Sequence, residues 1–205
     1  KQALWSKPLA WFGFYLSLGG VLMAALPLLS GKASVLYTFY PPLMAHPAFY
    51  IGATLLVVGS WVWCLQMVMM MTVWKKAHPG ETLPRAMFGT PANAILWFIT
   101  SHGVASEELF QMIPGSLGFI DTVDVGLARS LFSWTLHAIV DFWLIPVDVA
   151  MYTLLPKAAG GRLFSDQMAR VAFILLLVFS VPIGLHHLYM DPFQAAGWKF
   201  LHMTG

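Results

Sequence analysis

The sequence is poor in charged residues, and this shortage excludes a soluble protein. Charged residues make up 10% of its 205 residues, whereas hydrophobic residues make up 59%. An average soluble domain carries about 25% charged residues, because its surface has to be solvated. A chain with less than half of that share can cover little of itself with charge. We therefore expect an integral membrane protein.

Cysteine and net charge are also scarce. The single cysteine, Cys64, excludes an internal disulfide and a cysteine-rich metal site, so any metal must be bound by histidine and carboxylate. The net charge of +2 is too small to indicate a nucleic-acid partner. The chain begins at Lys1 without an initiator methionine or a signal peptide. We expect residues 1–205 to be a single transmembrane segment of a larger subunit.

Five apolar stretches are long enough to cross a bilayer as helices, which takes roughly 20 residues each. They are residues 9–29, 48–73, 91–113, 129–156 and 171–190. The loops between them contain proline, glycine and charged residues and are too short for a second domain. The sequence therefore predicts an all-α, polytopic transmembrane bundle of about five spans.

Basic residues are distributed unevenly between the two sides of these spans. One side carries Lys1, Lys7, Lys75, Lys76, Arg85, Lys157, Arg162 and Arg170, and the other carries Lys32, Arg129 and Lys199. Short cytoplasmic loops retain an excess of Lys and Arg, so the N-terminus is predicted to be cytoplasmic. The expected location is a bacterial inner membrane.

Four polar residues share one face of the fourth span. Asp141, Asp148 and Tyr152 follow His137 by 4, 11 and 15 positions, which places them about 40°, 20° and 60° from it on a helix. An ionisable group inside a bilayer costs about 3 kcal/mol or more, so this stripe indicates a proton path from the cytoplasmic side to a histidine site. The alternative is helix packing, with these side chains hydrogen-bonded to neighbouring helices.

A histidine pair, His186 and His187, lies near the outer end of the fifth span, at the expected depth of His137. Pro182 removes a backbone hydrogen bond there and can bend the helix. Three imidazoles with an open coordination position suit copper or iron in redox chemistry, or zinc in hydrolysis. These histidines are therefore the candidate metal ligands, the alternative being that each is an ordinary core residue.

The third span adds two carboxylates, Glu107 and Glu108, in its outer half. Glu107 is expected to lie roughly level with His137 and shares a helix face with Gln111. It is a candidate proton-carrying group beside the metal site. The alternative is a side chain within reach of water on the outer side.

Several short motifs follow one another along the chain. They are Tyr37-Thr38-Phe39-Tyr40-Pro41-Pro42-Leu43, Ala128-Arg129-Ser130-Leu131-Phe132, Trp134-Thr135-Leu136-His137, Phe142-Trp143-Leu144-Ile145-Pro146, residues 152–161, residues 165–170, residues 182–187 and Asp191-Pro192. Together they resemble subunit I of the heme-copper oxygen reductases, most closely the B-family. The resemblance implies that the five spans are helices three to seven of a subunit with twelve or more. It also implies that the three histidines bind the non-heme metal beside a high-spin heme, whose ligands lie outside this chain.

The chain departs from the family pattern at Asp141. Oxygen reductases of this branch usually show His-Pro-x-Val-Tyr at the first metal ligand, and here the run is His137-Ala138-Ile139-Val140-Asp141. That tyrosine can supply an electron and a proton for O–O cleavage, which a carboxylate cannot do. Nitric oxide reductases of the superfamily lack the tyrosine and place a carboxylate beside a metal that is commonly iron. A second tyrosine of the usual proton path is replaced by Asp148, while Tyr152 matches.

These observations predict the catalytic segment of a respiratory reductase, with nitric oxide reduction to nitrous oxide slightly favoured. The first alternative is a cytochrome c oxidase that reduces oxygen to water, and the second is a non-redox transporter or accessory subunit. The expected cofactors are a non-heme copper or iron and a heme of unknown type. The expected partners are the remainder of subunit I, a smaller electron-accepting subunit, a cytochrome c-like donor and membrane lipid.

Overall fold

The computed structural model describes residues 4–35 and 39–204. Lys1, counted above among the basic residues, and Tyr37 and Thr38 of the first motif lie outside the described residues. Four long helices form most of the bundle: α1 (Lys7–Leu29), α2 (Pro47–Ala77), α6 (Val125–Ala158) and α7 (Asp166–Ile183). The expected all-α bundle is confirmed, because every named element of the described residues is helical. The β-type pairing among these residues is one isolated bridge, between Ala33 and Ala45.

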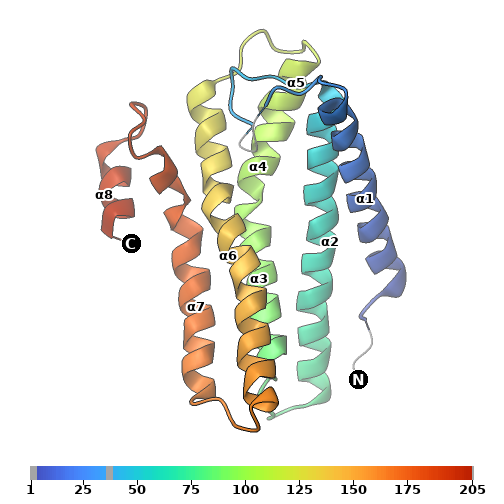
Figure 1. Ribbon diagram of the computed structural model, residues 1–205, viewed down its shortest axis with the longest axis vertical. Coiled ribbons are helices and arrows are strands. Elements are labelled where there is room, and N and C mark those ends of the chain that lie inside the picture. Colours follow the sequence, from blue (N-terminus) through green and yellow to red (C-terminus); the bar gives the residue numbers. More distant parts are fainter. Residues whose placement is uncertain (1–3, 36–38, 205) are drawn as a thin grey trace.

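Shorter helical segments complete the fold (Figure 1). A column beside α6 is built from α3 (Arg85–Thr100), α4 (His102–Glu107), the π-helical η1 (Glu108–Met112) and α5 (Ile113–Ser116). After α7 come the 3₁₀-helical η2 (Gly184–Leu188) and α8 (Ala196–Thr204). The chain runs up and down through these columns, and α8 folds back outside the bundle (Figure 1).

Polar side chains define where three of the long helices begin. The Ser6 hydroxyl accepts a hydrogen bond from the Leu9 amide, and Ser165 and Asp124 cap α7 and α6 in the same way. Each cap satisfies one backbone amide that has no partner within its helix. At the other end of α6, Gly160 adopts a φ of +67°, the left-handed conformation that ends helices and favours glycine.

The third expected span is interrupted rather than a single helix. Four helices, α1, α2, α6 and the α7–η2 segment, are each long and apolar enough to cross a membrane. Between α3 and α4, the Thr135 hydroxyl accepts from the Val104 amide at 2.9 Å and donates to the Thr100 carbonyl at 2.7 Å. In an unbroken helix these two backbone groups would bond to each other. Thr135 thus inserts into the helical ladder and satisfies both groups, as the interior of a membrane protein requires.

Helices α1 and α2 approach each other through small residues. A side chain on Gly52 would place its Cβ 2.5 Å from the Ala24 amide nitrogen and 2.6 Å from the Gly20 carbonyl oxygen. Gly13 and Gly59 lie at a second close approach between the same helices. In lipid the hydrophobic effect does not drive helices together, so close backbone packing at small residues stabilises their association.

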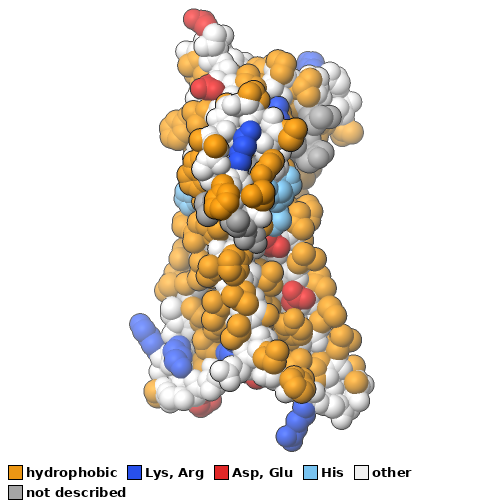
Figure 2. Space-filling view, turned by 90° about the vertical axis from the view of Figure 1, so that its left-hand side faces the viewer, with side chains coloured by type: hydrophobic (Ala, Val, Ile, Leu, Met, Phe, Trp, Pro, Cys, Tyr) orange, Lys and Arg blue, Asp and Glu red, His pale blue; other side chains and the backbone are white. Residues whose placement is uncertain are grey.

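The surface has the distribution that a membrane-spanning bundle requires. Hydrophobic side chains cover the visible face in Figure 2, and Lys and Arg gather toward its two ends. The described basic residues at the end where α1 begins are Lys7, Lys75, Lys76, Arg85, Lys157, Arg162 and Arg170. The excess of Lys and Arg at this end over the opposite end agrees with the predicted cytoplasmic N-terminus.

We predict that Gly52→Ala destabilises the bundle by about 1–3 kcal/mol, because the new methyl group has no space between the α1 and α2 backbones. Thermal unfolding of the purified complex measures this loss. Gly19→Ala is the matched control, since a Cβ there meets nothing within 4 Å. Equal midpoints for the two variants would contradict the close contact at Gly52.

Candidate metal centre

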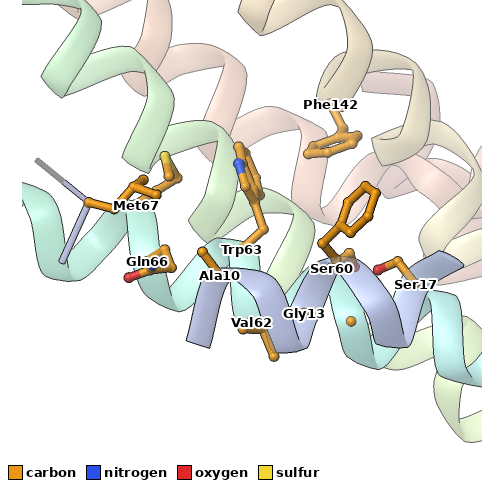
Figure 3. Close-up of a pocket in the computed structure, with 12 residues that line it drawn as sticks. Ala10, Gly13, Ser17, Ser60, Val62, Trp63, Gln66, Met67 and Phe142 are labelled. Atoms are coloured by element: carbon orange, nitrogen blue, oxygen red, sulfur yellow. The ribbon is translucent and has the colours of Figure 1, made fainter. Parts of the chain in front are cut away.

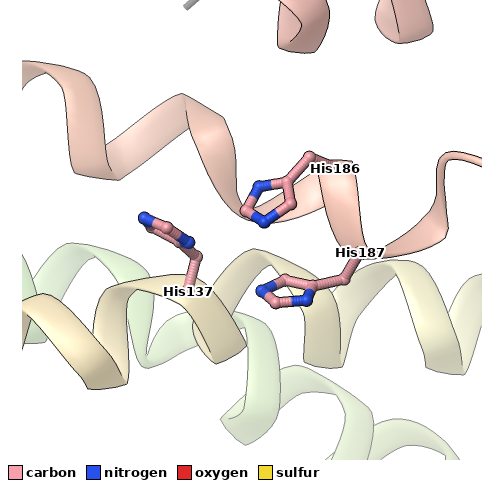
Figure 4. A group of neighbouring side chains, drawn as sticks. All are labelled: His137, His186 and His187. Atoms are coloured by element: carbon pink, nitrogen blue, oxygen red, sulfur yellow. The ribbon is translucent and has the colours of Figure 1, made fainter.

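Three histidines meet near one end of α6. His137 comes from α6, whereas His186 and His187 come from η2. One ring nitrogen of each lies within 4.8 Å of the others. The three rings face one shared space (Figure 4), and the centroid of the His137 ring is 4.8 Å from that of His186 and 5.9 Å from that of His187. The predicted gathering of these histidines is therefore present in the structure.

A hydrogen bond of His186 and a carboxylate contact of His137 indicate which nitrogen of each of these two rings is free for a metal. The Nδ1 atom of His186 lies 2.6 Å from the Ile183 carbonyl oxygen, which can only accept, so Nδ1 carries the proton and Nε2 is free. The Nε2 atom of His137 lies 3.4 Å from Oδ2 of Asp141, which leaves Nδ1 for a metal. A bond from the second ring nitrogen to a carbonyl or carboxylate is the usual support of a metal-binding histidine.

The spacing of the three rings fits a metal with a small closing movement. Ligand nitrogens about 2.1 Å from a tetrahedral ion lie roughly 3.4 Å apart. The nitrogens here are separated by up to 4.8 Å, so the most distant pair has to approach by about 1.4 Å to share one ion. Three neutral imidazoles leave a further coordination position open, which suits copper, iron or zinc.

The tight contact of η2 with α6 sets the position of His186 and His187. A side chain on Gly184 would collide with the Ser133 carbonyl oxygen and would place its Cβ 2.9 Å from the Trp134 carbonyl oxygen. The expected fifth span also changes its winding here, because α7 ends at Ile183 and the chain continues as the tighter η2. This change follows directly after Pro182, which lacks the backbone N–H that an α-helix requires.

An ion pair secures the segment that follows η2. Arg129 of α6 contacts Asp191 at 2.9 Å, and its guanidinium lies over the Tyr40 ring, 4.7 Å from the centroid. The Tyr40 hydroxyl is 2.9 Å from the Ser133 hydroxyl. Burial raises the pKa of Tyr40, so this hydroxyl stays protonated as part of the network. Arg129, Asp191 and Tyr40 all lie in the motifs that resemble the family, but their spacing along the chain does not predict this network.

The predicted proton-path residues lie along α6, but the described residues do not link them into a continuous chain. Asp141 is buried beside His137, as predicted. Asp148 is half-buried, and no hydrogen bond joins it to Asp141 or Tyr152 in the described part of the chain. The Tyr152 ring packs on Phe173, with centroids 5.7 Å apart.

Glu107 and Glu108 are fully buried, and none of their carboxylate oxygens has a hydrogen-bond partner in the described structure. They lie where α4 passes into η1, on the column beside α6. Among the described residues no ion pair connects Glu107 to the three histidines. The expected proximity of Glu107 to the metal site therefore stays a prediction.

A cavity of about 480 Å³ opens beside the histidines, between α6 and α7. His137, Asp141 and Ser180 contribute its polar groups, and the other lining residues are apolar. A second cavity, of about 360 Å³, lies between α1, α2 and Phe142 of α6 (Figure 3). None of its lining residues is a histidine, a cysteine or a carboxylate. The first cavity is thus the candidate site for a small apolar substrate near the metal.

Comparison with known proteins agrees with this geometry. A family model described as "Cytochrome C and Quinol oxidase polypeptide I" matches residues 1–205. The chain belongs to this oxidase subunit I family. Cytochrome c oxidase subunit 1 of Thermus thermophilus is 44% identical over 194 residues, which are 95% of this chain and 34% of that protein. A cryo-EM structure of a heme-copper terminal oxidase dimer matches with a TM-score of 0.94 and 47% identity, covering 99% of this chain and 35% of that one.

Family membership confirms several expectations. The resemblance to heme-copper oxidases was correct, and the chain is part of an integral membrane protein from a family of oxidoreductases that use heme and copper. The Thermus relative is consistent with a bacterial membrane. The chain spans about a third of the length of these relatives. A transporter receives no support from the comparisons.

We predict that Gly184→Ala lowers the non-heme metal content, because the added methyl group pushes η2 and its two histidines away from His137. Loss of a supporting contact typically reduces metal affinity by about 10–100-fold. The metal-to-heme ratio of the purified complex measures this effect. Gly197→Ala is the control, since a Cβ there meets nothing within 4 Å. Full metal content in the Gly184 variant would refute the positioning role of this contact.

Proposed function

We propose that this chain supplies the non-heme metal ligands of a respiratory reductase that reduces a diatomic gas. The observation that carries the proposal is the convergence of His137, His186 and His187, with ligand nitrogens within 4.8 Å of one another. The family match and the two named relatives support a catalytic subunit of the heme-copper type. The remainder of subunit I would hold the hemes, since the chain covers about a third of its relatives.

Oxygen is the first candidate substrate, reduced to water. Its support comes from the relatives, whose names are cytochrome c oxidase subunit 1 and heme-copper terminal oxidase. Copper is then the expected non-heme metal. The electron donor would be a cytochrome c-like protein acting through a smaller electron-accepting subunit. The expected preference for nitric oxide receives no support from these names.

Nitric oxide is the second candidate, and Asp141 is the observation that favours it. The position four residues after His137, where the family's oxygen reductases usually carry tyrosine, holds a buried carboxylate 3.4 Å from the ligand ring. A carboxylate cannot donate the electron that the tyrosine supplies to oxygen chemistry. It can hold a proton, and forming nitrous oxide from two molecules of nitric oxide consumes two protons and two electrons. Iron is the expected metal for this reaction.

The residues of this chain have separate roles in either reaction. The metal, with the neighbouring heme, would bind the gas and deliver electrons to it. Asp141 lies with its Oδ2 3.4 Å from Nε2 of His137, where it is proposed to orient that ring and to pass a proton toward the cavity. Asp148 and Tyr152 are proposed to conduct protons from the cytoplasmic side, and Glu107 is proposed as a further proton carrier.

We predict that the purified enzyme, supplied with reduced electron donor, consumes oxygen at least tenfold faster than nitric oxide, because both named relatives are oxidases. Oxygen and nitric oxide electrodes measure both rates on one preparation. The reverse ratio, together with iron as the non-heme metal, would establish nitric oxide as the substrate. Turnover of neither gas by an enzyme that contains heme would contradict the proposed function.

We predict that Asp141→Asn lowers turnover by at least tenfold and leaves heme content unchanged, because asparagine keeps the shape but cannot carry a proton, and general acid–base groups contribute about 10²–10⁴-fold. Steady-state gas consumption and the heme spectrum measure the two quantities. Asp121→Asn is the control, since Asp121 is exposed in the loop before α6. If turnover survives in the Asp141 variant, that residue has only a structural role.

A further inference from the structure

A basic pocket lies at the end of the bundle opposite the histidines, where α3 and α7 begin and α6 ends. Its volume is about 330 Å³. Arg85, Lys157 and Arg170 supply three positive charges to its walls, and Asp166 supplies one negative charge. The excess of positive charge makes the basic pocket a candidate site for an anion.

The two arginines are held rigidly and still keep free donors. Nε of Arg85 contacts one oxygen of Asp166 at 3.2 Å, and Nε of Arg170 contacts the other at 2.7 Å. Arg85 also donates from Nη1 to the Tyr152 carbonyl oxygen at 2.6 Å, and Arg170 donates from Nη2 to the Leu83 carbonyl oxygen. Nη2 of Arg85 and Nη1 of Arg170 make no hydrogen bond in the described structure. Because a guanidinium has five N–H donors, both arginines can bind a further acceptor without losing these contacts.

An unpartnered buried hydroxyl gives a second, independent indication of a ligand. Thr153 lines the basic pocket, and its Oγ1 is buried and has no hydrogen-bond partner among the described residues. A buried polar group without a partner is unfavourable unless a ligand or water satisfies it. Lys157 adds an exposed ammonium group at the rim. Together these residues place guanidinium and ammonium donors around one small space whose wall includes Thr153.

The position of the basic pocket indicates where the anion comes from. It lies at the end of the bundle that carries Lys75 and Lys76, the side predicted to face the cytoplasm. Two positions before and after Asp166, which lines the pocket, the Phe164 side chain is 95% exposed and that of Met168 is 63% exposed. Exposed apolar side chains close to a basic pocket at the membrane surface suit a phospholipid. Its acyl chains would pack on the apolar residues, and its anionic headgroup would bind in the pocket.

We propose that the basic pocket binds the phosphate group of an anionic phospholipid of the cytoplasmic leaflet. The free nitrogens of Arg85 and Arg170 would contact two phosphate oxygens, with the Thr153 hydroxyl and the Lys157 ammonium beside them. A guanidinium group is planar and carries several N–H donors, so arginine is well suited to binding phosphate oxygens. Because Arg85 also holds the Tyr152 carbonyl, the bound lipid would connect the ends of α3, α6 and α7 at the cytoplasmic surface.

Native mass spectrometry of the complete enzyme, released from nanodiscs of equal phosphatidylglycerol and phosphatidylcholine, tests the proposal. The wild type is expected to retain one phosphatidylglycerol in preference to phosphatidylcholine. Lys157→Gln should lower this retention at least threefold, whereas Lys76→Gln, which removes an exposed charge from the same end of the bundle, should leave it unchanged. The heme spectrum verifies that each variant is folded.

Thr153→Val provides a second test that keeps every charge. It removes the unpartnered hydroxyl with little change of shape, and reduced retention of phosphatidylglycerol is expected. Equal retention of the two lipids by the wild type, or equal loss in the Lys157 and Lys76 variants, would overturn the proposal. Displacement of the lipid by inorganic phosphate at about its cellular millimolar concentration would also overturn it, because the pocket would then be a site for the free anion.

Discussion

At Gly184 the backbone of η2 passes so close to α6 that only a hydrogen atom fits between them. Everything that makes the histidine cluster possible depends on this contact. It places His186 and His187 opposite His137, although they come from a different helix. The ion pair between Arg129 and Asp191 then fixes the chain on the far side of η2. A larger residue at position 184 would separate the ligands before any question of metal chemistry arose.

Asp141 contacts the candidate ligand His137 and also distinguishes the two candidate reactions, reduction of oxygen and of nitric oxide. Its contact with Nε2 of His137 occupies one ring nitrogen and leaves the other free for a metal. The Asp141 carboxylate contacts the ring nitrogen that is not assigned to the metal. From this position it is proposed to orient the His137 ring and to hold a proton. The resemblance to oxygen reductases implies a tyrosine at this position. One side chain, one helical turn from a ligand, is therefore where the two candidate reactions differ.

The interior of the bundle satisfies most of its polar groups locally. Thr135 fills the break between α3 and α4, and the Trp97 indole donates to the Ser60 hydroxyl at 2.6 Å. The exceptions are informative because an unpaired polar group inside a membrane protein is costly. Glu107 and Glu108 are such exceptions near η1, and the Thr153 hydroxyl is another in the basic pocket. Protonation lowers the cost of burying such a carboxylate, and a bound water or ligand would satisfy such a hydroxyl.

The sequence by itself determined the helical spans, their orientation and the candidate ligands, because apolar run length, loop charge and residue spacing are local properties. The depths of His137 and the His186–His187 pair also followed from counting along two helices. Only the tertiary structure decided how the third span breaks, since the break depends on a hydroxyl from α6. It also decided which nitrogen is free in His137 and His186. It also showed Gly184 as the close contact and gathered Arg85, Lys157 and Arg170 into one pocket. Such features arise between helices, where sequence periodicity carries no information about distance.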